Sequence, residues 1–146
     1  MKTNGGFYIS QIKQIQARIF DQLLRNAGID DFSGAQGRIL YVLWSEDDLP
    51  ITELAKRTGL AKPTLTSMLD RLEKSCVLRR VPDPNDRRQI RIKLTDAAWA
   101  LSSKYDLVSD QMVDIFYKGF TEEEIAAFEA TLIRIIDNLK EKECSI

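Results

Sequence analysis

Residues that could carry out chemistry are few in this chain. It has no histidine, and its two cysteines, Cys76 and Cys144, lie 68 positions apart. Two thiols cannot complete the four-ligand sphere of a zinc site, and a histidine-based catalytic triad is excluded. Glycine-rich phosphate loops are also missing, while Glu122 and Glu124 suit the positive end of a helix dipole. We therefore expect no enzyme, no metal site and no cofactor.

Arginine and lysine are instead concentrated in the middle of the chain. Over all 146 residues, 21 basic and 22 acidic side chains give a net charge of -1. Residues 51–95 hold eleven basic and five acidic residues, a net charge of +6, whereas residues 1–50 carry -1 and residues 96–146 carry -6. A centre with this charge attracts a polyanion. Binding of nucleic acid is the chemistry that this pattern favours.

Two short helices and a hairpin are expected to position the basic centre. The composition of Thr52–Thr58 predicts a helix that stops at Gly59, and a second helix is predicted from Lys62 to about Ser75. The pattern then changes to a strand over Val77–Val81, a proline-rich turn, and strict alternation over Ile90–Leu94. Two helices joined by a glycine-containing turn and followed by a hairpin match a winged helix-turn-helix.

Long amphipathic helices are expected on both sides of this module. Apolar residues recur at helical spacing over Phe7–Ala27, and Ser33 with Gln36 forms a capping box that opens a second helix. Helical spacing returns over Thr95–Lys118, and a last helix opens at Thr121. The prediction is one domain over residues 1–146, mainly α, with a small two-stranded β-hairpin as the wing.

The sequence also bears on where the protein works. Its uninterrupted apolar runs are far shorter than the ~20 residues that span a bilayer. Two distant cysteines make no disulfide framework, and the N-terminus does not resemble a signal peptide. We expect a protein of the reducing cytoplasm that does not enter the membrane.

The order of these elements resembles a known family. The segment Ile51–Thr95, with the flanking helices, resembles the MarR family of bacterial winged helix-turn-helix transcription regulators. The resemblance implies a ligand-responsive repressor that binds an inverted-repeat operator in double-stranded DNA as a homodimer. It divides the chain into a DNA-binding lobe, residues 33–95, and a helical dimerisation region, residues 7–28 and 96–143. The pieces that carry it by order and spacing are Glu53-Leu54-Ala55, Asp70-Arg71-Leu72-Glu73, Asp86-x-Arg88 and Leu94-Thr95.

The resemblance puts the helix that begins at Lys62 in the major groove. Independently, Leu65, Leu69 and Leu72 form an apolar stripe that must face the core, which leaves the opposite face outward. The alternative is an ordinary solvated face, because helix-turn-helix outlines also serve as protein contacts. The implied DNA-facing residues are Lys62, Pro63, Thr64, Thr66, Ser67 and Arg71.

In the family's pattern, Asp86 orients the wing-tip arginine, Arg88, which enters the minor groove. Arg87 is a second candidate for that role, and Arg91 is a further candidate contact. A narrow minor groove concentrates negative potential and favours a guanidinium. The alternative is that Asp86 and Arg88 form only a surface ion pair worth about 0 to 1 kcal/mol. We favour the DNA contact because the hairpin adds further cations, Arg79, Arg80 and Lys93.

Three positions depart from the family's pattern. Cys76 and Ala98 stand where glycine is usual, and Ala61 stands where a capping serine is common. Strain is expected at Cys76 if its φ is positive. The first-helix cysteine of the family's peroxide-sensing branch is missing, so neither cysteine is given a redox role.

The resemblance also implies a dimer and an effector pocket. A monomer of this size would struggle to cover the apolar stripes of the flanking helices, which favours a homodimer. Tyr41, Trp44 and Tyr105 are candidates for the lining of a pocket for a small aromatic or phenolic effector, with burial in the core as the alternative. The competing function is a winged-helix protein-interaction module, favoured by the near-zero net charge. The implied dimer contacts are Ile12, Ile125, Leu132, Ile135 and Leu139.

Overall fold

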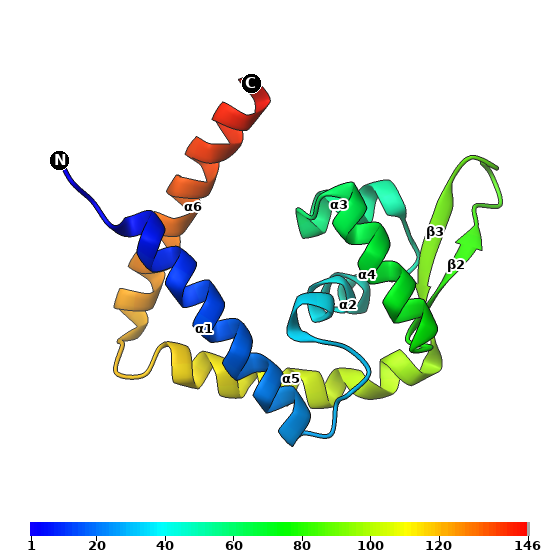
Figure 1. Ribbon diagram of the computed structural model, residues 1–146, viewed down its shortest axis with the longest axis horizontal. Helices are drawn as coiled ribbons and strands as arrows, with labels where there is room; N and C mark the ends of the chain where they lie inside the picture. The colour runs from blue at the N-terminus through cyan, green and yellow to red at the C-terminus, as the bar shows by residue number, and fades with distance from the viewer. Residues whose placement is uncertain (146) are drawn as a thin grey trace. The chain divides into compact units, whose positions relative to one another are not determined.

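The computed structural model describes residues 1–145 and divides into two compact units, residues 1–110 and the residues from 111 onward. None of the helices that it describes is long and apolar enough to cross a membrane. The elements, in chain order, are α1 Gly5–Asn26, α2 Gly34–Ser45, β1 Leu49–Pro50, α3 Ile51–Thr58, α4 Lys62–Lys74, β2 Leu78–Pro82, β3 Ile90–Leu94, α5 Asp96–Phe116 and α6 Glu122–Ser145 (Figure 1).

Local sequence signals set the ends of the helices in the first unit. The capping box before α2 is confirmed, because the Gln36 N–H donates to Ser33 Oγ and the Ser33 N–H donates to Gln36 Oε1. Helix α3 ends at Gly59, whose φ of 69° is in the left-handed region that glycine adopts without strain. Pro63 lies in the first turn of α4, where no helical N–H is needed.

The apolar stripe of α4 is buried, as predicted. Leu65, Leu69 and Leu72 have no exposed surface and belong to the same core as residues of α2, α3 and the sheet. This burial fixes which face of α4 points outward. The fully buried partners include Ile39, Leu40, Leu43, Leu54 and Ile92.

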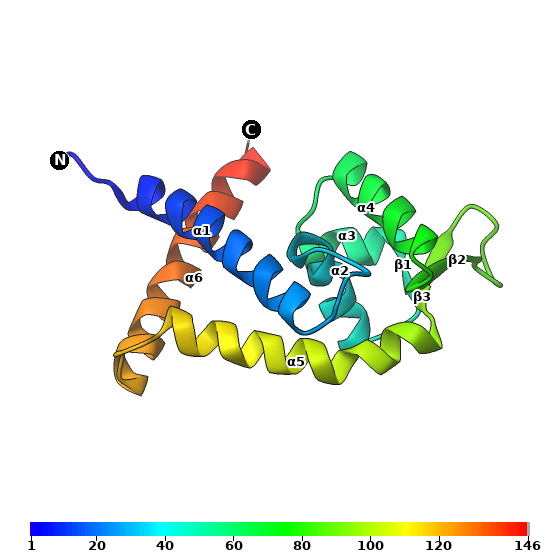
Figure 2. The same ribbon diagram turned by 60° about the horizontal axis from the view of Figure 1, so that its bottom comes forward.

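The sheet has one strand more than the predicted hairpin. Strands β2 and β3 pair antiparallel, as expected, and β1 pairs antiparallel with the other edge of β3, which gives the order β1-β3-β2 (Figure 2). Leu49 lies opposite Ile92 in this register. The expectation of a two-stranded sheet was therefore incomplete, because β1 has two residues and carries no periodic signal.

The second unit contains the end of α5 and α6. The capping box predicted at Thr121 is confirmed, with Glu124 as its partner. The Tyr117 hydroxyl donates a hydrogen bond of 2.7 Å to Glu129 Oε2, and this bond raises the pKa of Tyr117 to about 12. No residue of α6 within this unit is fully buried.

Candidate nucleic-acid interface

Helix α4 presents a polar face on the side away from its leucines. Thr64, Ser67 and Arg71 are exposed, as are Lys62 and Pro63. Thr66 is exposed too, although its hydroxyl donates to the Lys62 carbonyl at 2.9 Å and keeps only its oxygen lone pairs for another partner. The sequence-predicted residues of the recognition helix are therefore all accessible to solvent.

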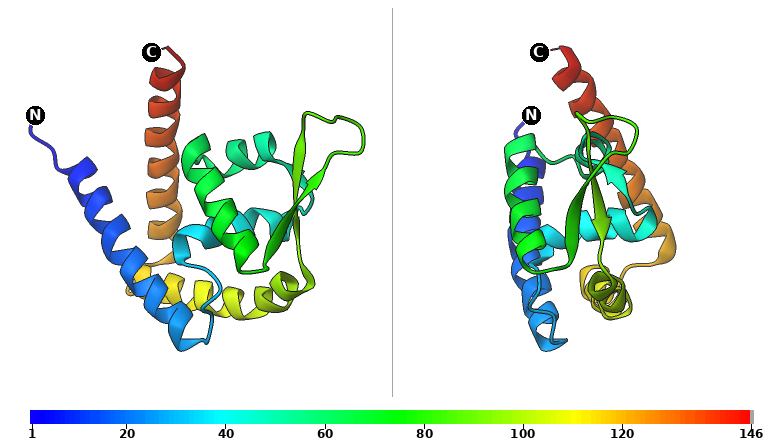
Figure 3. Two further views of the ribbon diagram at one scale, coloured as in Figure 1. Left: turned by 45° about the vertical axis from the view of Figure 1, so that its right-hand side comes forward. Right: turned by 90° about the vertical axis from the view of Figure 1, so that its right-hand side faces the viewer.

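The loop between β2 and β3 is held by its own polar contacts and projects clear of the helices of this unit (Figure 3). The Asp83 carboxylate is buried and accepts the backbone N–H groups of Asn85 and Asp86 at 2.8 and 3.2 Å. These hydrogen bonds, the first above all, together with Arg91, lower the pKa of Asp83. Asp83 is therefore charged at neutral pH, where its carboxylate holds these two N–H groups of the loop.

Asp86 and Arg88 meet at the tip of this loop. Asp86 Oδ1 accepts the backbone N–H of Arg88 at 3.0 Å and lies 3.6 Å from its Nε. The Arg88 side chain is 94% exposed, so the guanidinium points into solvent. Arg87 is also exposed and makes no ion pair with any residue that the structure describes.

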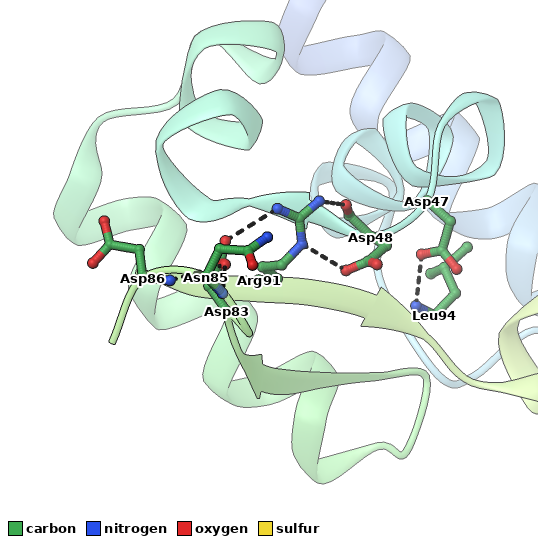
Figure 4. A network of polar contacts seen from close by, with 7 residues as sticks. All are labelled: Asp47, Asp48, Asp83, Asn85, Asp86, Arg91 and Leu94. Carbon is green, nitrogen blue, oxygen red and sulfur yellow. Dashed lines mark hydrogen bonds and ion pairs between the residues drawn. The ribbon is translucent and has the colours of Figure 1, made fainter. Parts of the chain in front are cut away.

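Arg91 differs from the tip arginines, because its guanidinium is half-buried and is bonded to acidic residues (Figure 4). It bonds Asp48 Oδ1 at 3.0 Å and Asp83 Oδ2 at 3.2 Å, and it also donates to the Asp48 carbonyl. Bonding to these carboxylates raises its pKa. Arg91 thus joins the loop before β1 to the base of the wing loop, a geometry that suits a positioning role rather than the predicted DNA contact.

Arg80 is engaged in the same way. Its guanidinium bonds Asp70 Oδ1 at 2.8 Å and Glu73 Oε1 at 2.9 Å, and its backbone N–H donates to Glu73 Oε2. These contacts join β2 to α4, the helix of the exposed polar face. Two cations counted in the +6 centre, Arg80 and Arg91, are therefore half-buried and paired with carboxylates of their own chain.

The turn after α4 contains the strain that the sequence suggested. Cys76 has a φ of 62°, and the Cys76 and Val77 N–H groups bond the carbonyls of Glu73 and Leu72. Cys76 thus ends α4 in the left-handed conformation. Glycine adopts this conformation without the steric cost that a Cβ adds. Ala61 gives α4 no side-chain cap, as expected.

A hollow of about 400 Å³ includes two of the three candidate effector residues. Tyr41 and Tyr105 line it together with Phe20, Lys13 and Arg38. The third candidate is not in this lining, because Trp44 packs on Tyr105 and donates its indole N–H to the Ala98 carbonyl at 3.1 Å. Burial raises the pKa of the Tyr105 hydroxyl, which keeps it a donor.

The predicted dimer contacts differ in exposure. Ile12, Ile135 and Leu139 are exposed, Leu139 by 65%, whereas Ile125 and Leu132 are half-buried within their own chain. Further exposed apolar residues of α1 are Phe7, Tyr8, Ile9 and Ile15, and those of α6 are Ile133 and Ile136.

Comparisons with known proteins identify the family of this chain. Residues 32–90 match the model of the MarR family. The uncharacterized HTH-type transcriptional regulator YsmB of Bacillus subtilis (strain 168) is 33% identical over 103 residues, which are 70% of this chain and 70% of that protein. The chain belongs to the MarR family. Relatives in the MarR family are transcriptional regulators rather than enzymes, which confirms the expected function class.

MarR itself is similar over most of the chain. The multiple antibiotic resistance protein MarR of Escherichia coli (strain K12) is 28% identical over 132 residues, 90% of each protein. A crystal structure of a mutant E. coli MarR in complex with operator DNA covers 89% of this chain and 91% of that one, with a TM-score of 0.81 and 28% identity. These likenesses confirm the winged-helix fold of a MarR-family regulator.

Sequence reasoning missed several residues of the candidate interface and of the hollow beside Tyr41. Asp48 and Asp83 hold Arg91, but Asp48 is 43 positions away from it. Asp83 had a local signal, because an aspartate two residues before Asn85 in a proline-rich turn is typical of an Asx turn. Lys13 and Arg38 in the hollow had no local sequence signal, since α1 and α2 bring them together only in the folded chain.

Proposed function

We propose that the chain is a repressor that binds double-stranded DNA, with α4 in the major groove and Arg88 in the minor groove. The observation that carries this proposal is the division among the arginines. Arg80 and Arg91 are bonded to carboxylates, while Arg71 is exposed on α4 and Arg88 is exposed at the wing tip. Exposed guanidiniums on α4 and on a hydrogen-bonded loop suit binding to phosphates and grooves.

We further propose that two copies bind one operator. Exposed isoleucines on α1 and on α6, together with Leu139, leave apolar surface in contact with water. Burial of this surface against a second copy would be favourable. A two-fold dimer places its recognition helices about one DNA turn (~34 Å) apart. The matching operator is an inverted repeat.

The test begins with selection of bound fragments from genomic DNA, followed by titration of the selected operator at several salt concentrations. Specific binding should weaken steeply with salt, because several phosphates per subunit release counterions. Arg71→Ala and Arg88→Ala should weaken binding, and Lys104→Ala on α5 is the matched control. Absence of any enriched sequence, or binding that does not respond to salt, would favour the protein-interaction module instead.

We also propose that the hollow beside Tyr41 and Tyr105 binds a small aromatic anion that controls DNA binding. Its size falls in the range of ligand pockets, and its wall combines aromatic rings with the cations Lys13 and Arg38. Tyr105, whose hydroxyl pKa is raised by burial, adds an aromatic ring with a protonated hydroxyl to this lining. A ligand that prefers the state unfit for DNA would release the operator.

Thermal shift with aromatic carboxylates and phenols, followed by measurement of operator release, tests the proposal for this hollow. The Lys13→Gln/Arg38→Gln variant should lose the response, whereas Lys104→Gln, outside the hollow, should keep it. Ligands that stabilise the protein without changing DNA affinity would contradict the control of DNA binding.

A further inference from the structure

Two cations at the base of the wing form no ion pair with any residue that the structure describes. Arg79 on β2 and Lys93 on β3 are directly opposite one another, one pair from the open end of the hairpin. Both are exposed, and neither forms an ion pair within residues 1–145. Like charges directly opposite destabilise an antiparallel pair. No ion pair within residues 1–145 offsets this repulsion directly.

A second hollow, of about 410 Å³, opens beside this pair. Its lining includes Arg79, Lys93 and the indole of Trp99, which is 43% exposed. Trp99 thus brings a partly exposed aromatic side chain into a lining that also contains two positive charges. The volume is within the range that small ligands occupy. The remaining lining residues are Asp47, Leu94, Thr95 and Asp96.

The other polar residues of this lining have structural roles. Asp47 Oδ1 accepts the Leu94 N–H at 2.9 Å, and the Thr95 hydroxyl donates to the Cys76 carbonyl at 2.7 Å. Asp96 lies in the first turn of α5, where the helix dipole stabilises a carboxylate. The two cations are thus the charges of this hollow that the fold leaves without a role.

We propose that this wing-base hollow binds a small molecule that carries an anionic group on a flat ring. Arg79 and Lys93 hold the phosphate or carboxylate, which removes their mutual repulsion. The ring stacks on Trp99. The free carboxylate oxygens of Asp47 and Asp96 accept hydrogen bonds from amino or hydroxyl groups on the ring, which favours ligands that carry such donors.

The wing-base hollow is separate from the sites proposed above. It shares no lining residue with the hollow at Tyr41. The wing-tip loop begins only after the Pro82–Ile90 pair, three pairs beyond Arg79 and Lys93, or roughly 10 Å along the strands. Binding here can therefore be measured without DNA, and its outcome does not depend on the repressor proposal.

Trp99 supplies a direct readout in the intact protein. The chain has two tryptophans, so the proton–nitrogen correlation spectrum has two indole signals, which Trp99→Phe assigns. The probes are AMP and salicylate, which carry a phosphate and a carboxylate, with inorganic phosphate and adenosine as the separate halves of AMP. At least one ring-bearing anion should shift the Trp99 signal saturably. For AMP, the affinity should exceed that of either half by about tenfold or more.

Charge-neutralising variants complete the experiment. Arg79→Gln/Lys93→Gln should weaken binding about tenfold or more, and it should melt no lower than the wild type because a repulsion is removed. Arg87→Gln at the wing tip and Lys13→Gln/Arg38→Gln in the other hollow should leave the Trp99 response unchanged. A Trp99 signal that does not move, that moves equally with phosphate alone, or that moves equally in Arg79→Gln/Lys93→Gln would overturn the proposal. A shallower salt dependence of DNA binding in that variant, with no Trp99 response, would instead assign the cations to DNA phosphates.

Discussion

At the scale of single residues, the arginines of the basic centre divide into free and engaged groups. Arg88 is 94% exposed and meets only Asp86, which holds its backbone N–H and lies near its Nε. If Arg88 enters the minor groove, Arg88→Ala should cost on the order of 1 to 3 kcal/mol on specific DNA. Titration of the selected operator with wild type and variant measures this cost.

Two further variants make the Arg88 test specific. Asp86→Ala should reproduce part of the loss, because the arginine is then unoriented. Lys142→Ala, which removes a charge from the end of α6, should cost little. Equal affinities for Arg88→Ala and Lys142→Ala would mean that the wing tip makes no specific contact, and the assignment of Arg88 would be withdrawn.

Arg91 provides the opposite case. Because its guanidinium bonds Asp48 and Asp83, we expect Arg91→Gln to lower the midpoint of thermal unfolding and to weaken DNA binding through a disordered wing. The slope of log affinity against log salt should stay unchanged. A slope reduced by about one would instead identify Arg91 as a phosphate contact. For thermal unfolding, Arg87→Gln is the control that changes charge without removing these bonds.

The pKa of Asp83 indicates the pH range in which its carboxylate can bond Arg91 and the loop N–H groups. Its folded-state pKa is lowered below 3.8, chiefly by the Asn85 N–H and by Arg91. The stability that it contributes is therefore fully present above that value and is lost as the pH falls through the folded-state pKa. The wing should keep its shape at every pH at which DNA binding is ordinarily measured.

The partners of the charged side chains were the part that the sequence predicted least well. The exposed face of α4 followed from the spacing of Leu65, Leu69 and Leu72, because burial of one helix face determines the other. The engagement of Arg80 and Arg91 did not follow, since composition counts charges without their partners. Asp48 comes from a loop 43 positions before Arg91, and local patterns carry no information about such pairs.

At the scale of elements, boundaries with a local physical cause were predicted well. Capping boxes at Ser33 and Thr121 and the glycine stop at Gly59 act within a few residues, so the sequence displays them. Strand β1 was missed because two residues become a strand only by pairing with Ile92 and Arg91. A strand produced by tertiary pairing has no period to detect.

The end of α4 offers a test of strain. Cys76 holds a φ of 62°, which costs a residue with a Cβ roughly 1 to 2 kcal/mol. Cys76→Gly should raise the free energy of unfolding by about 1 kcal/mol, after the greater entropy of glycine in the unfolded chain is subtracted. Chemical denaturation under reducing conditions measures the change.

Controls separate strain from removal of a thiol. Cys76→Ala removes the sulfur and keeps the Cβ, so it should not stabilise the protein. Cys144→Gly, near the end of α6, should stabilise nothing, because glycine is unfavourable in a helix. If Cys76→Ala stabilised the protein as much as Cys76→Gly, the gain would come from loss of the thiol and not from relief of the backbone.

At the scale of the whole molecule, the proposed dimer accounts both for the exposed apolar residues and for the inverted repeat expected in the operator. The sequence predicted a seam along α6, but Leu132 of that seam is half-buried within its own chain, so its substitution would also disturb the protomer. Leu139, which is 65% exposed, tests the interface without that complication.

Leu139→Asp should weaken the proposed dimer by roughly tenfold or more, because a carboxylate would have to enter an apolar contact. Light scattering over a concentration series measures the change. Lys140→Asp, which places the same charge on the next residue and a different helix face, should have a smaller effect. Affinity for the full inverted repeat should fall with dimerisation in Leu139→Asp, while affinity for a single half-site should not, because only the full site binds two linked lobes. A wild-type protein that stays monomeric at micromolar concentration would contradict the dimer and, with it, the expectation of an inverted repeat.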